Sequence, residues 1–322
     1  MKIKARAPSN IAFIKYWGKK NEKLRIPANS SISMNLSDAY TETSVNFNED
    51  LRDDLVIIDG KKIEGKEKER ISEHMDIIRK MAGIGTFAEV ESKNNFPKGA
   101  GIASSASGFA ALTVAGAKAS GLNLSEKELS ILARLGSGSA CRSIPDGFVE
   151  WKTGSKSNNS YAYSIKPSGY WDICDVIAVV GEKAKKVSST EGHRQAKESP
   201  FYKARISCMN EKIKNIKLAL KNKDFTRFGK IIEEEAINMH TVMMTGKPSL
   251  FYWLPKTLEI MQSVVDWRDS GLETYFTIDA GPNIHIICVA KDAKKVKAKL
   301  EKIQGVKKII INKASEGARI LK

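Results

Sequence analysis

The chain has 322 residues, of which 42% are hydrophobic and 28% charged, and its formal net charge at pH 7 is +16. This composition fits a soluble globular protein, and the length predicts two domains, or two lobes that share one cleft. The apolar runs are far shorter than the roughly 20 residues of a membrane-spanning helix, and the N-terminus has no signal-peptide cleavage site, so we expect a cytoplasmic protein without membrane contact.

Strands and turns dominate the secondary structure predicted for the first half of the chain. Strands are expected at 2–7, 11–16, 31–36, 42–47, 55–58, 61–63, 86–92, 147–151, 162–165 and 176–180. The pair 55–58 and 61–63 reads as a hairpin over Asp59-Gly60. Helices are expected at 66–82, 106–122 and 125–135. Ser125 and Glu128 have the spacing of a capping box, which fixes the start of the third of these helices.

A polar loop over 183–192 separates this half from a more helical one. We therefore expect an N-terminal lobe of residues 1–183 and a C-terminal lobe of residues 184–322. In the second lobe, helices are expected at 201–221, 225–241, 254–270 and 293–302, and strands at 275–278, 284–289 and 307–311. Helices and strands mixed without a regular βαβ repeat predict an α+β fold rather than a doubly wound sheet.

The segment 96–112, FPKGAGIASSASGFAAL, has the composition of a phosphate cradle. Gly99 and Gly101 lack a Cβ atom and let the backbone approach an anion, while Ser104, Ser105 and Ser107 offer hydroxyl donors. The start of the following helix would add unpaired N–H groups and a partial positive charge. The segment has neither a Walker Gly-Lys-Ser/Thr nor GxGxxG spacing. The alternative interpretation is a helix start whose small residues only pack tightly.

Two further clusters combine cations with small polar residues. In NIAFIKYWGK, residues 10–19, a strand would point Lys15 and Tyr16 to opposite faces, and a glycine lets Lys19 turn back toward a cleft. In GSGSACR, residues 136–142, two serine hydroxyls precede Arg142, whose planar guanidinium can bind both oxygens of a carboxylate. An edge strand with solvated lysines and an ordinary flexible loop are the respective alternatives.

The other two clusters lie in the predicted second lobe. The loop VSSTEG, residues 187–192, is rich in hydroxyls that can contact phosphate. In TIDAGPN, residues 277–283, Asp279 ends a strand before a sharp turn, which is a suitable place for a catalytic base. The alternative for Asp279 is an Asx-turn that only stabilises the corner.

The cysteines do not form a metal motif. The four of them show no CxxC pair and no metal-ligand spacing with histidine, so we expect no zinc site. Cys208 lies in a lysine-rich, helical and exposed segment and, in a hyperthermophile, is the candidate for a disulfide bridge across a dimer. The histidines His74, His193, His240 and His285 are expected to be structural.

Together, NIAFIKYWGK, NNFPKGAGIASSASGFAAL, GSGSACRS with GFVEW, SSTEG and TIDAGPN occur in the order found in diphosphomevalonate decarboxylases, which belong to the GHMP kinase superfamily. The resemblance covers residues 3 to about 290. It implies a two-lobed GHMP kinase fold, with an N-terminal lobe like domain 2 of ribosomal protein S5 and a C-terminal ferredoxin-like lobe. It also implies a homodimer.

The resemblance implies a Mg²⁺- and ATP-dependent reaction on mevalonate 5-diphosphate. The 3-hydroxyl is phosphorylated, phosphate leaves, and loss of CO₂ gives isopentenyl diphosphate. Motif by motif, the implied catalytic residues are Asp279, which accepts or orients the hydroxyl proton, Arg142, which holds the substrate carboxylate and keeps Asp279 ionised, and Lys19. The implied diphosphate contacts are Tyr16, Lys19, Ser137, Ser139, Ser189 and Thr190. The implied ATP contacts are Asn94, Gly99, Gly101, Ser104, Ser105 and Ser107, with Ser105 the candidate contact for Mg²⁺ held by the ATP phosphates.

Two positions depart from the family pattern. Asp146 in SIPDGF brings a negative charge near the expected anionic substrate, and Thr190 stands where some bacterial members carry an arginine that contacts phosphate. These departures leave open a phosphomevalonate decarboxylase that acts on the 5-monophosphate. A kinase that phosphorylates the 3-hydroxyl without decarboxylation also remains an alternative.

A nucleic-acid-binding protein would explain the net charge of +16 in a different way. The lysines are interleaved with glutamates, as in 64–70 and 291–302, and no nucleic-acid module accompanies them. We therefore expect most of these charges to form solvated faces and expect no nucleic-acid partner.

Overall fold

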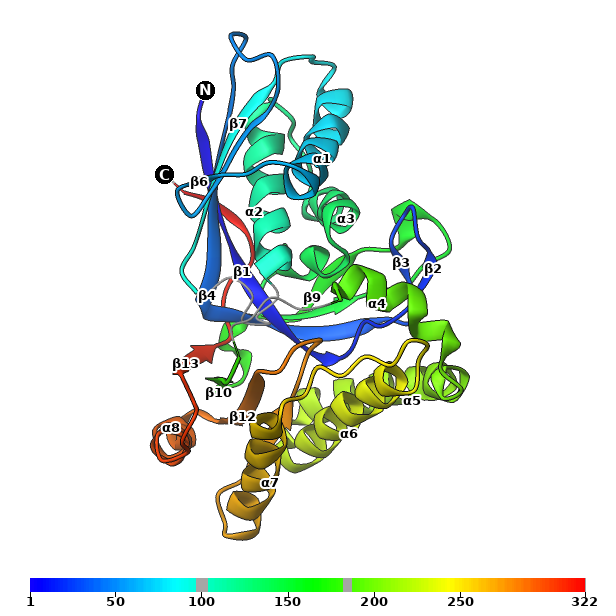
Figure 1. Ribbon diagram of the computed structural model, residues 1–322, viewed down its shortest axis with the longest axis vertical. Coiled ribbons are helices and arrows are strands. Elements are labelled where there is room, and N and C mark those ends of the chain that lie inside the picture. Colours follow the sequence, from blue (N-terminus) through cyan, green and yellow to red (C-terminus); the bar gives the residue numbers. More distant parts are fainter. Residues whose placement is uncertain (97–103, 182–186, 322) are drawn as a thin grey trace.

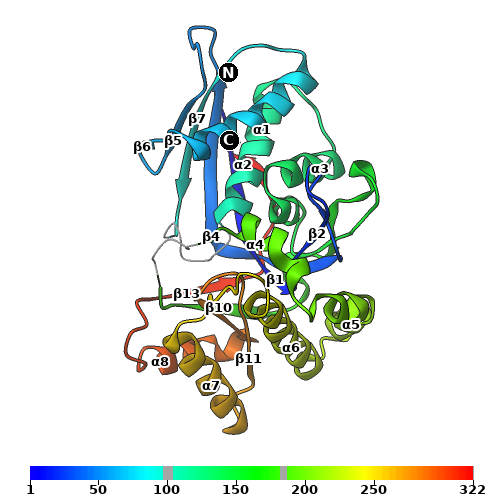
Figure 2. The ribbon, with the colours of Figure 1, turned by 45° about the vertical axis from the view of Figure 1, so that its right-hand side comes forward.

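The computed structural model describes residues 1–96, 104–181 and 187–321, apart from the side chain of Thr190. Two β-sheets, each covered by helices, form two lobes that lie one above the other in Figure 1 and Figure 2. No helix in the described ranges is long and apolar enough to cross a membrane. The predicted two-lobed mixture of helices and strands is confirmed.

The first lobe is built on a sheet that has eight strands among the described residues. Its main path runs in the order β14 (Arg319–Leu321), β1 (Ile3–Ile14), β4 (Ser31–Phe47), β7 (Ala88–Asn94), β5 (Leu55–Ile58) and β6 (Lys61–Lys62). A branch adds β8 (Phe148–Trp151), paired with β4, and β9 (Ala162–Lys166), paired with β8. Helices α1 (Lys66–Ala82), α2 (Ser104–Ala119) and α3 (Glu126–Gly136) pack against small and β-branched residues of this sheet.

Strands β1 and β4 are each continuous where the sequence predicts two shorter strands. In β1 the pairing with β4 shifts register between Pro8 and Asn10, which lets the strand pass a residue that has no N–H donor. Strand β4 runs through Ser37 and Asp38, which the sequence pattern reads as an interruption. Because both strands continue, one half of each reaches the second lobe.

The second lobe contains a four-stranded antiparallel sheet with the order β11 (Thr274–Thr277), β12 (Ile284–Val289), β10 (Ile173–Val179) and β13 (Lys308–Lys313). Side chains alternate between its two faces. Val176 and its neighbours on one face pack against α7 (Pro255–Asp269) and α8 (Ala293–Leu300). On the other face, Ile177 shares a core with α5 (Tyr202–Asn222), α6 (Phe225–Met244) and the ends of β1 and β4. One hydrophobic core therefore joins the lobes.

The strand pairing differs from the predicted division at residue 183. Strand β10 precedes that position but pairs with β12 and β13 in the second sheet. Strand β14, close to the C-terminus, pairs with β1 in the first sheet. An apolar run such as β10 does not reveal which strands will flank it, and the short strand β14 carries no periodic pattern. The last strand thus returns the chain to the first lobe.

Most of the predicted helices are confirmed to within a few residues, including the capping box at Ser125. The segment predicted as a polar loop at 187–192 instead contains helix α4 (Ser189–Gln195), whose N-cap Ser188 accepts a hydrogen bond from the backbone N–H of Glu191 at 3.2 Å. The remaining short elements are β2 (Lys19–Asn21), β3 (Ile26–Pro27), η1 (Gly138–Ser143), η2 (Ser157–Asn159), η3 (Ser168–Tyr170), η4 (Ala196–Glu198) and η5 (Ala290–Asp292).

Candidate active site

An ion pair connects the two lobes at the predicted catalytic aspartate. Lys15 directly follows β1 of the first lobe, and Asp279 follows β11 of the second. The Lys15 Nζ donates to Asp279 Oδ1 at 2.7 Å. The Lys15 side chain is 1% exposed, whereas that of Asp279 is 23% exposed. The carboxylate therefore has a buried cationic partner and a side that a substrate can reach.

This environment keeps the carboxylate of Asp279 ionised. Burial alone would raise its pKa, but the charge and hydrogen bond of Lys15, together with His285 and Arg142, outweigh burial and hold the pKa below the usual range of an aspartate. Burial conversely lowers the pKa of Lys15, against the stabilising charge of Asp279. A carboxylate that is ionised at neutral pH can accept a proton from a hydroxyl group or orient that hydroxyl group.

Helix α6 positions both members of this pair. Glu235 accepts a hydrogen bond from the backbone N–H of Lys15 at 3.1 Å, and it is itself paired with Arg205 of α5 at 2.6 Å. His240, just over one turn later, donates from Nε2 to the backbone carbonyl of Asp279 at 3.1 Å. Burial lowers the pKa of His240 to about 3, so this histidine is a neutral, structural donor.

We expect Glu235→Gln to lower the free energy of unfolding by about 3–5 kcal/mol, because it leaves the Arg205 guanidinium buried without its counter-charge. Both side chains are 0% exposed. The matched control is Glu234→Gln, on the same helix, because Glu234 is 67% exposed and exposed pairs contribute about 0–1 kcal/mol. Urea unfolding of both variants measures the difference. Equal midpoints would show that the buried pair does not stabilise this junction.

The predicted carboxylate-binding arginine is buried between the lobes. Arg142, in η1, donates from Nη1 to Ser31 Oγ at 2.8 Å, and from Nε and Nη2 to Asn10 Oδ1 at 3.2 and 3.0 Å. Among the described residues, the hydrogen-bond partners of Arg142 are thus neutral. Its positive charge lowers the pKa of Asp279 and has no direct carboxylate partner there. Asn10 and Ser31 were not predicted as site residues, although Asn10 opens the motif that carries Lys15.

Tyr16 lies beyond the end of β1, so the prediction that it alternates with Lys15 along a strand is wrong. Its ring packs against His193 of α4, with centroids 4.0 Å apart, and against Trp151 at 4.6 Å. His193 accepts a hydrogen bond at Nδ1 from the Gly18 N–H at 2.9 Å, and burial lowers its pKa well below the usual range. A neutral His193 therefore holds α4 against residues 16–18.

Lys19 is buried at the start of β2, and its Nζ lies 2.6 Å from Glu22 Oε2. Ser137, at the end of α3, has its hydroxyl 3.2 Å from that of Ser105 at the start of α2. The carbonyl of Ser139 accepts from the side chain of Asn10 at 3.3 Å. The segment predicted to bind ATP and the segment predicted to bind the substrate diphosphate therefore meet through Ser105 and Ser137. Ser137 directly precedes η1, which carries Arg142.

The predicted ATP contacts divide into four groups. Ser104 and Ser105 are partly exposed at the start of α2, where unpaired backbone N–H groups favour an anion. Ser107 is fully buried, and its hydroxyl lies 2.7 Å from Thr41 Oγ1, so it faces the sheet. Asn94 donates from its side chain to Asp59 and accepts from Thr41, which ties together β4, β7 and the β5–β6 turn. Gly99 and Gly101 lie outside the described residues.

Two residues of note lie away from these contacts. Asp146 accepts a hydrogen bond from the Gly317 N–H at 2.6 Å, so its carboxylate faces the segment before β14. Cys208 is partly buried, packs against the shared core and donates to the Arg205 carbonyl at 3.1 Å.

The predicted diphosphate contacts Ser189 and Thr190 are the first two residues of α4. The side chain of Ser189 is half-buried.

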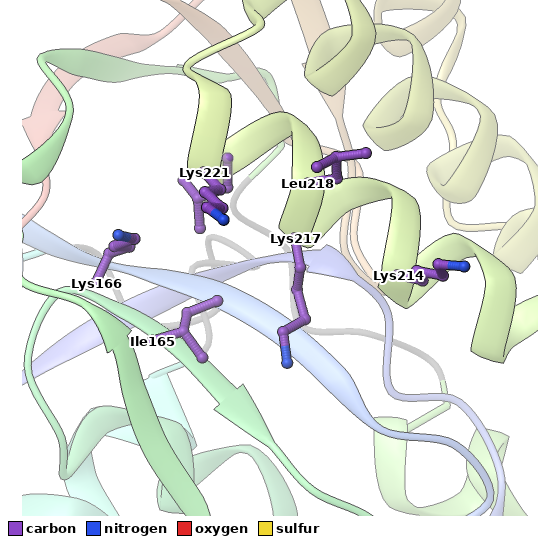
Figure 3. Close-up of a pocket in the computed structure, with 7 residues that line it drawn as sticks. Ile165, Lys166, Lys214, Lys217, Leu218 and Lys221 are labelled. Carbon is purple, nitrogen blue, oxygen red and sulfur yellow. The ribbon is translucent and has the colours of Figure 1, made fainter.

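A separate pocket lies between β9 and α5, with a volume of about 380 Å³ (Figure 3). It is lined by Ile165, Lys166, Lys214, Lys217, Leu218, Leu220 and Lys221. The Lys217 ammonium binds Glu150 at 2.7 Å, and in Figure 3 Lys214 points away from the other lysines. None of the predicted site residues lines this pocket. The described residues also contain no cluster of three or more His, Cys, Asp or Glu side chains that would hold a metal ion.

Two protein-family models together match almost the whole chain. A model described as the diphosphomevalonate decarboxylase-like N-terminal domain matches residues 7–162, and one described as the mevalonate 5-diphosphate decarboxylase C-terminal domain matches residues 175–320. Diphosphomevalonate decarboxylase of Debaryomyces hansenii is 35% identical, with 91% of this chain and 80% of that protein covered. Phosphomevalonate decarboxylase of Haloferax volcanii is 31% identical, with 89% and 88% covered.

Solved structures give the same result. Mevalonate diphosphate decarboxylase from Staphylococcus aureus is 41% identical with a TM-score of 0.96, and 100% of this chain and 98% of that chain are covered. A structure described as MDDEF in complex with MVAPP, AMPPCP and magnesium is 38% identical with a TM-score of 0.94, at 100% and 99% coverage. With this identity over nearly its full length, the chain belongs to the diphosphomevalonate decarboxylase family.

Proposed function

We propose that this protein catalyses the ATP-dependent decarboxylation of mevalonate 5-diphosphate to isopentenyl diphosphate, with release of ADP, phosphate and CO₂. The observation that carries the proposal is the Lys15–Asp279 ion pair at the junction of the lobes, with the guanidinium of Arg142 nearby and bound to neutral partners. A proton acceptor and a cation are thus available to the two groups that react, the 3-hydroxyl and the carboxylate. Membership in the family supports this substrate.

In this reaction Asp279 takes the proton of the 3-hydroxyl while the hydroxyl oxygen forms a bond to the γ-phosphorus of ATP, and the bond from that phosphorus to the departing ADP breaks. Lys15 keeps Asp279 ionised before the transfer and fixes one carboxylate oxygen, so the other is free to face the substrate. Once phosphorylated, the tertiary oxygen is a better leaving group because its electrons depart with phosphate. The carbon that it leaves becomes electron-deficient.

Arg142 binds the substrate carboxylate in this proposal. Its guanidinium can form two parallel hydrogen bonds to a carboxylate, and its own position is fixed by Asn10 and Ser31. Holding the carboxylate next to the electron-deficient carbon favours breakage of the bond to CO₂, whose electron pair forms the new double bond. No protein base is needed for that step.

The start of α2 fits the phosphate groups of ATP. Ser104 and Ser105 are partly exposed there, and the end of the helix provides unpaired N–H groups. ATP supplies the phosphoryl group for the 3-hydroxyl, and Mg²⁺ neutralises charge on its phosphates. In this proposal the magnesium ion is held by the ATP phosphates, with the Ser105 hydroxyl beside it. Asn94, Gly99 and Gly101 complete the ATP site in this proposal.

The diphosphate of the substrate is assigned to Tyr16, Lys19, Ser137, Ser139, Ser189 and Thr190. Lys19 provides a buried ammonium, and burial raises the pKa of the Tyr16 hydroxyl, which therefore remains a hydrogen-bond donor. We further propose that the protein is a cytoplasmic homodimer and that its ligands are small molecules, with neither nucleic acid nor membrane among its partners.

Substrate choice is tested with mevalonate 5-diphosphate and mevalonate 5-phosphate at equal concentrations, with CO₂ and ADP followed in the same reactions. We expect the kcat/KM for the diphosphate to exceed that for the monophosphate by about a hundredfold, because a site with a buried cation loses a charge-assisted contact when the second phosphate is missing. The reverse preference would favour the activity of the Haloferax relative. ADP formation without CO₂ would identify a kinase.

A further inference from the structure

Three charged residues meet where α4 approaches the β2–β3 hairpin, and we call them the Lys19–Glu22–Arg194 cluster. Both ribbon views place α4 beside this hairpin (Figures 1 and 2). Glu22 Oε2 lies 2.6 Å from Lys19 Nζ and 3.9 Å from Arg194 Nε. Arg194 also pairs with Glu191 of its own helix at 3.3 Å. One carboxylate oxygen therefore faces two cations from separate parts of the chain.

The three side chains differ in how freely they can move. The Lys19 side chain is 2% exposed, so its ammonium is held in place. Those of Glu22 and Arg194 are 49% and 60% exposed, so each can change rotamer without losing buried contacts. Arg25 adds a further positive charge that acts on Lys19. A fixed cation with an exposed, movable counter-anion is a suitable arrangement for exchange of one anion for another.

Arg194 also lies one helical turn after position 190 in α4. Lys19 and the start of α4 are both assigned to the substrate diphosphate in the proposed function. Arg194 extends this assignment to a second cation, whose planar guanidinium can bind two phosphate oxygens. A terminal phosphate group placed between Lys19 and Arg194 would occupy the position that the Glu22 carboxylate takes.

We propose that Glu22 is an exchangeable counter-anion for Lys19 and Arg194, and that the terminal phosphate of the diphosphate substrate displaces it and bridges these two cations. The identity of the substrate rests on the proposed function. Any diphosphate that reaches Lys19 and Arg194, including inorganic diphosphate, should displace Glu22 in the same way. Glu22 would then compete with the substrate, and Arg194 would distinguish a diphosphate from a monophosphate.

The test is calorimetric titration without ATP, using inorganic diphosphate, inorganic phosphate and mevalonate 5-diphosphate as probes. For both diphosphates we expect Glu22→Gln to lower the Kd about fivefold, because it removes a competing charge-assisted contact. We expect Arg194→Gln to raise their Kd about tenfold and to change binding of inorganic phosphate less than about twofold. The matched control is Glu191→Gln, which removes the other carboxylate near Arg194 but does not contact Lys19. It should change each Kd by less than about twofold.

A higher Kd in Glu22→Gln would overturn the proposal, because it would mean that Glu22 supports the charge of Lys19 rather than competing for it. Equal effects of Arg194→Gln on diphosphate and phosphate would overturn the assignment of Arg194. Failure of the proposed function is distinguished by a separate readout. Absence of CO₂ release by the wild-type protein would refute the function while the titrations with inorganic diphosphate still decide the exchange.

Discussion

Asp279→Asn is expected to reduce kcat for CO₂ release by about a thousandfold or more, because general-base catalysis typically contributes factors of 10²–10⁴ and the amide cannot accept the hydroxyl proton. The substitution keeps the size of the side chain and its carbonyl oxygen can still accept from Lys15. Binding of mevalonate 5-diphosphate should therefore change little. Initial rates of labelled CO₂ release and a calorimetric Kd for the same preparation provide the two readouts.

The matched control for this variant is Asp146→Asn. Asp146 also lies next to a strand, but this residue is exposed and its carboxylate accepts a hydrogen bond from the backbone N–H of Gly317. We expect its kcat to stay within about twofold of wild type, as for a surface substitution away from the site. Wild-type turnover in Asp279→Asn would remove Asp279 from the proton transfer, and loss of both binding and turnover would show that it mainly supports the structure.

The second large effect is expected for Lys15→Met, which removes the buried ammonium but keeps much of the side-chain volume. Without it, burial favours the protonated form of Asp279, so the pKa of that carboxyl rises. We expect kcat/KM at neutral pH to fall by about a hundredfold, the lower end of the range for removal of general-base function.

The pH dependence of kcat/KM should shift in a defined direction in Lys15→Met. Asp279 must be ionised to accept a proton, and Lys15 stabilises the ionised form. Removing Lys15 means that a lower proton concentration is needed to ionise Asp279, so the acidic limb of the kcat/KM profile should move to higher pH. The control is Lys214→Met in the separate pocket of Figure 3, which should leave the profile unchanged. An unshifted acidic limb in Lys15→Met would contradict the assigned coupling.

Local signals in the sequence predict several residues of the proposed site. Asp279 is a candidate because a strand pattern ends there before Gly and Pro, and the N-terminus of α2 is one because small residues and hydroxyls precede an alanine-rich helix. Arg142 is a candidate as a cation within a run of small residues. The pairing of Lys15 with Asp279 could not be predicted, because it joins residues that are 264 positions apart and depends on how the lobes pack.

The sequence also does not predict which lobe each strand joins, because this too depends on contacts between distant residues. The apolar pattern of 176–180 predicts a strand but not its neighbours, which follow it by more than a hundred residues. The helix at Ser189–Gln195 was missed because its single-residue cap and seven-residue length leave little hydrophobic periodicity. Likewise His240 supports Asp279 through a backbone carbonyl, a contact for which a sequence carries no pattern.

The decarboxylase activity assigned to the site around the ion pair between the lobes is measured by incubating the purified protein with 1-carboxyl-labelled mevalonate 5-diphosphate, ATP and Mg²⁺, and counting labelled CO₂ against ADP. We expect equal amounts of CO₂ and ADP, and no CO₂ when ATP is omitted. Formation of ADP without labelled CO₂, or release of CO₂ without ATP, would contradict an ATP-dependent decarboxylase.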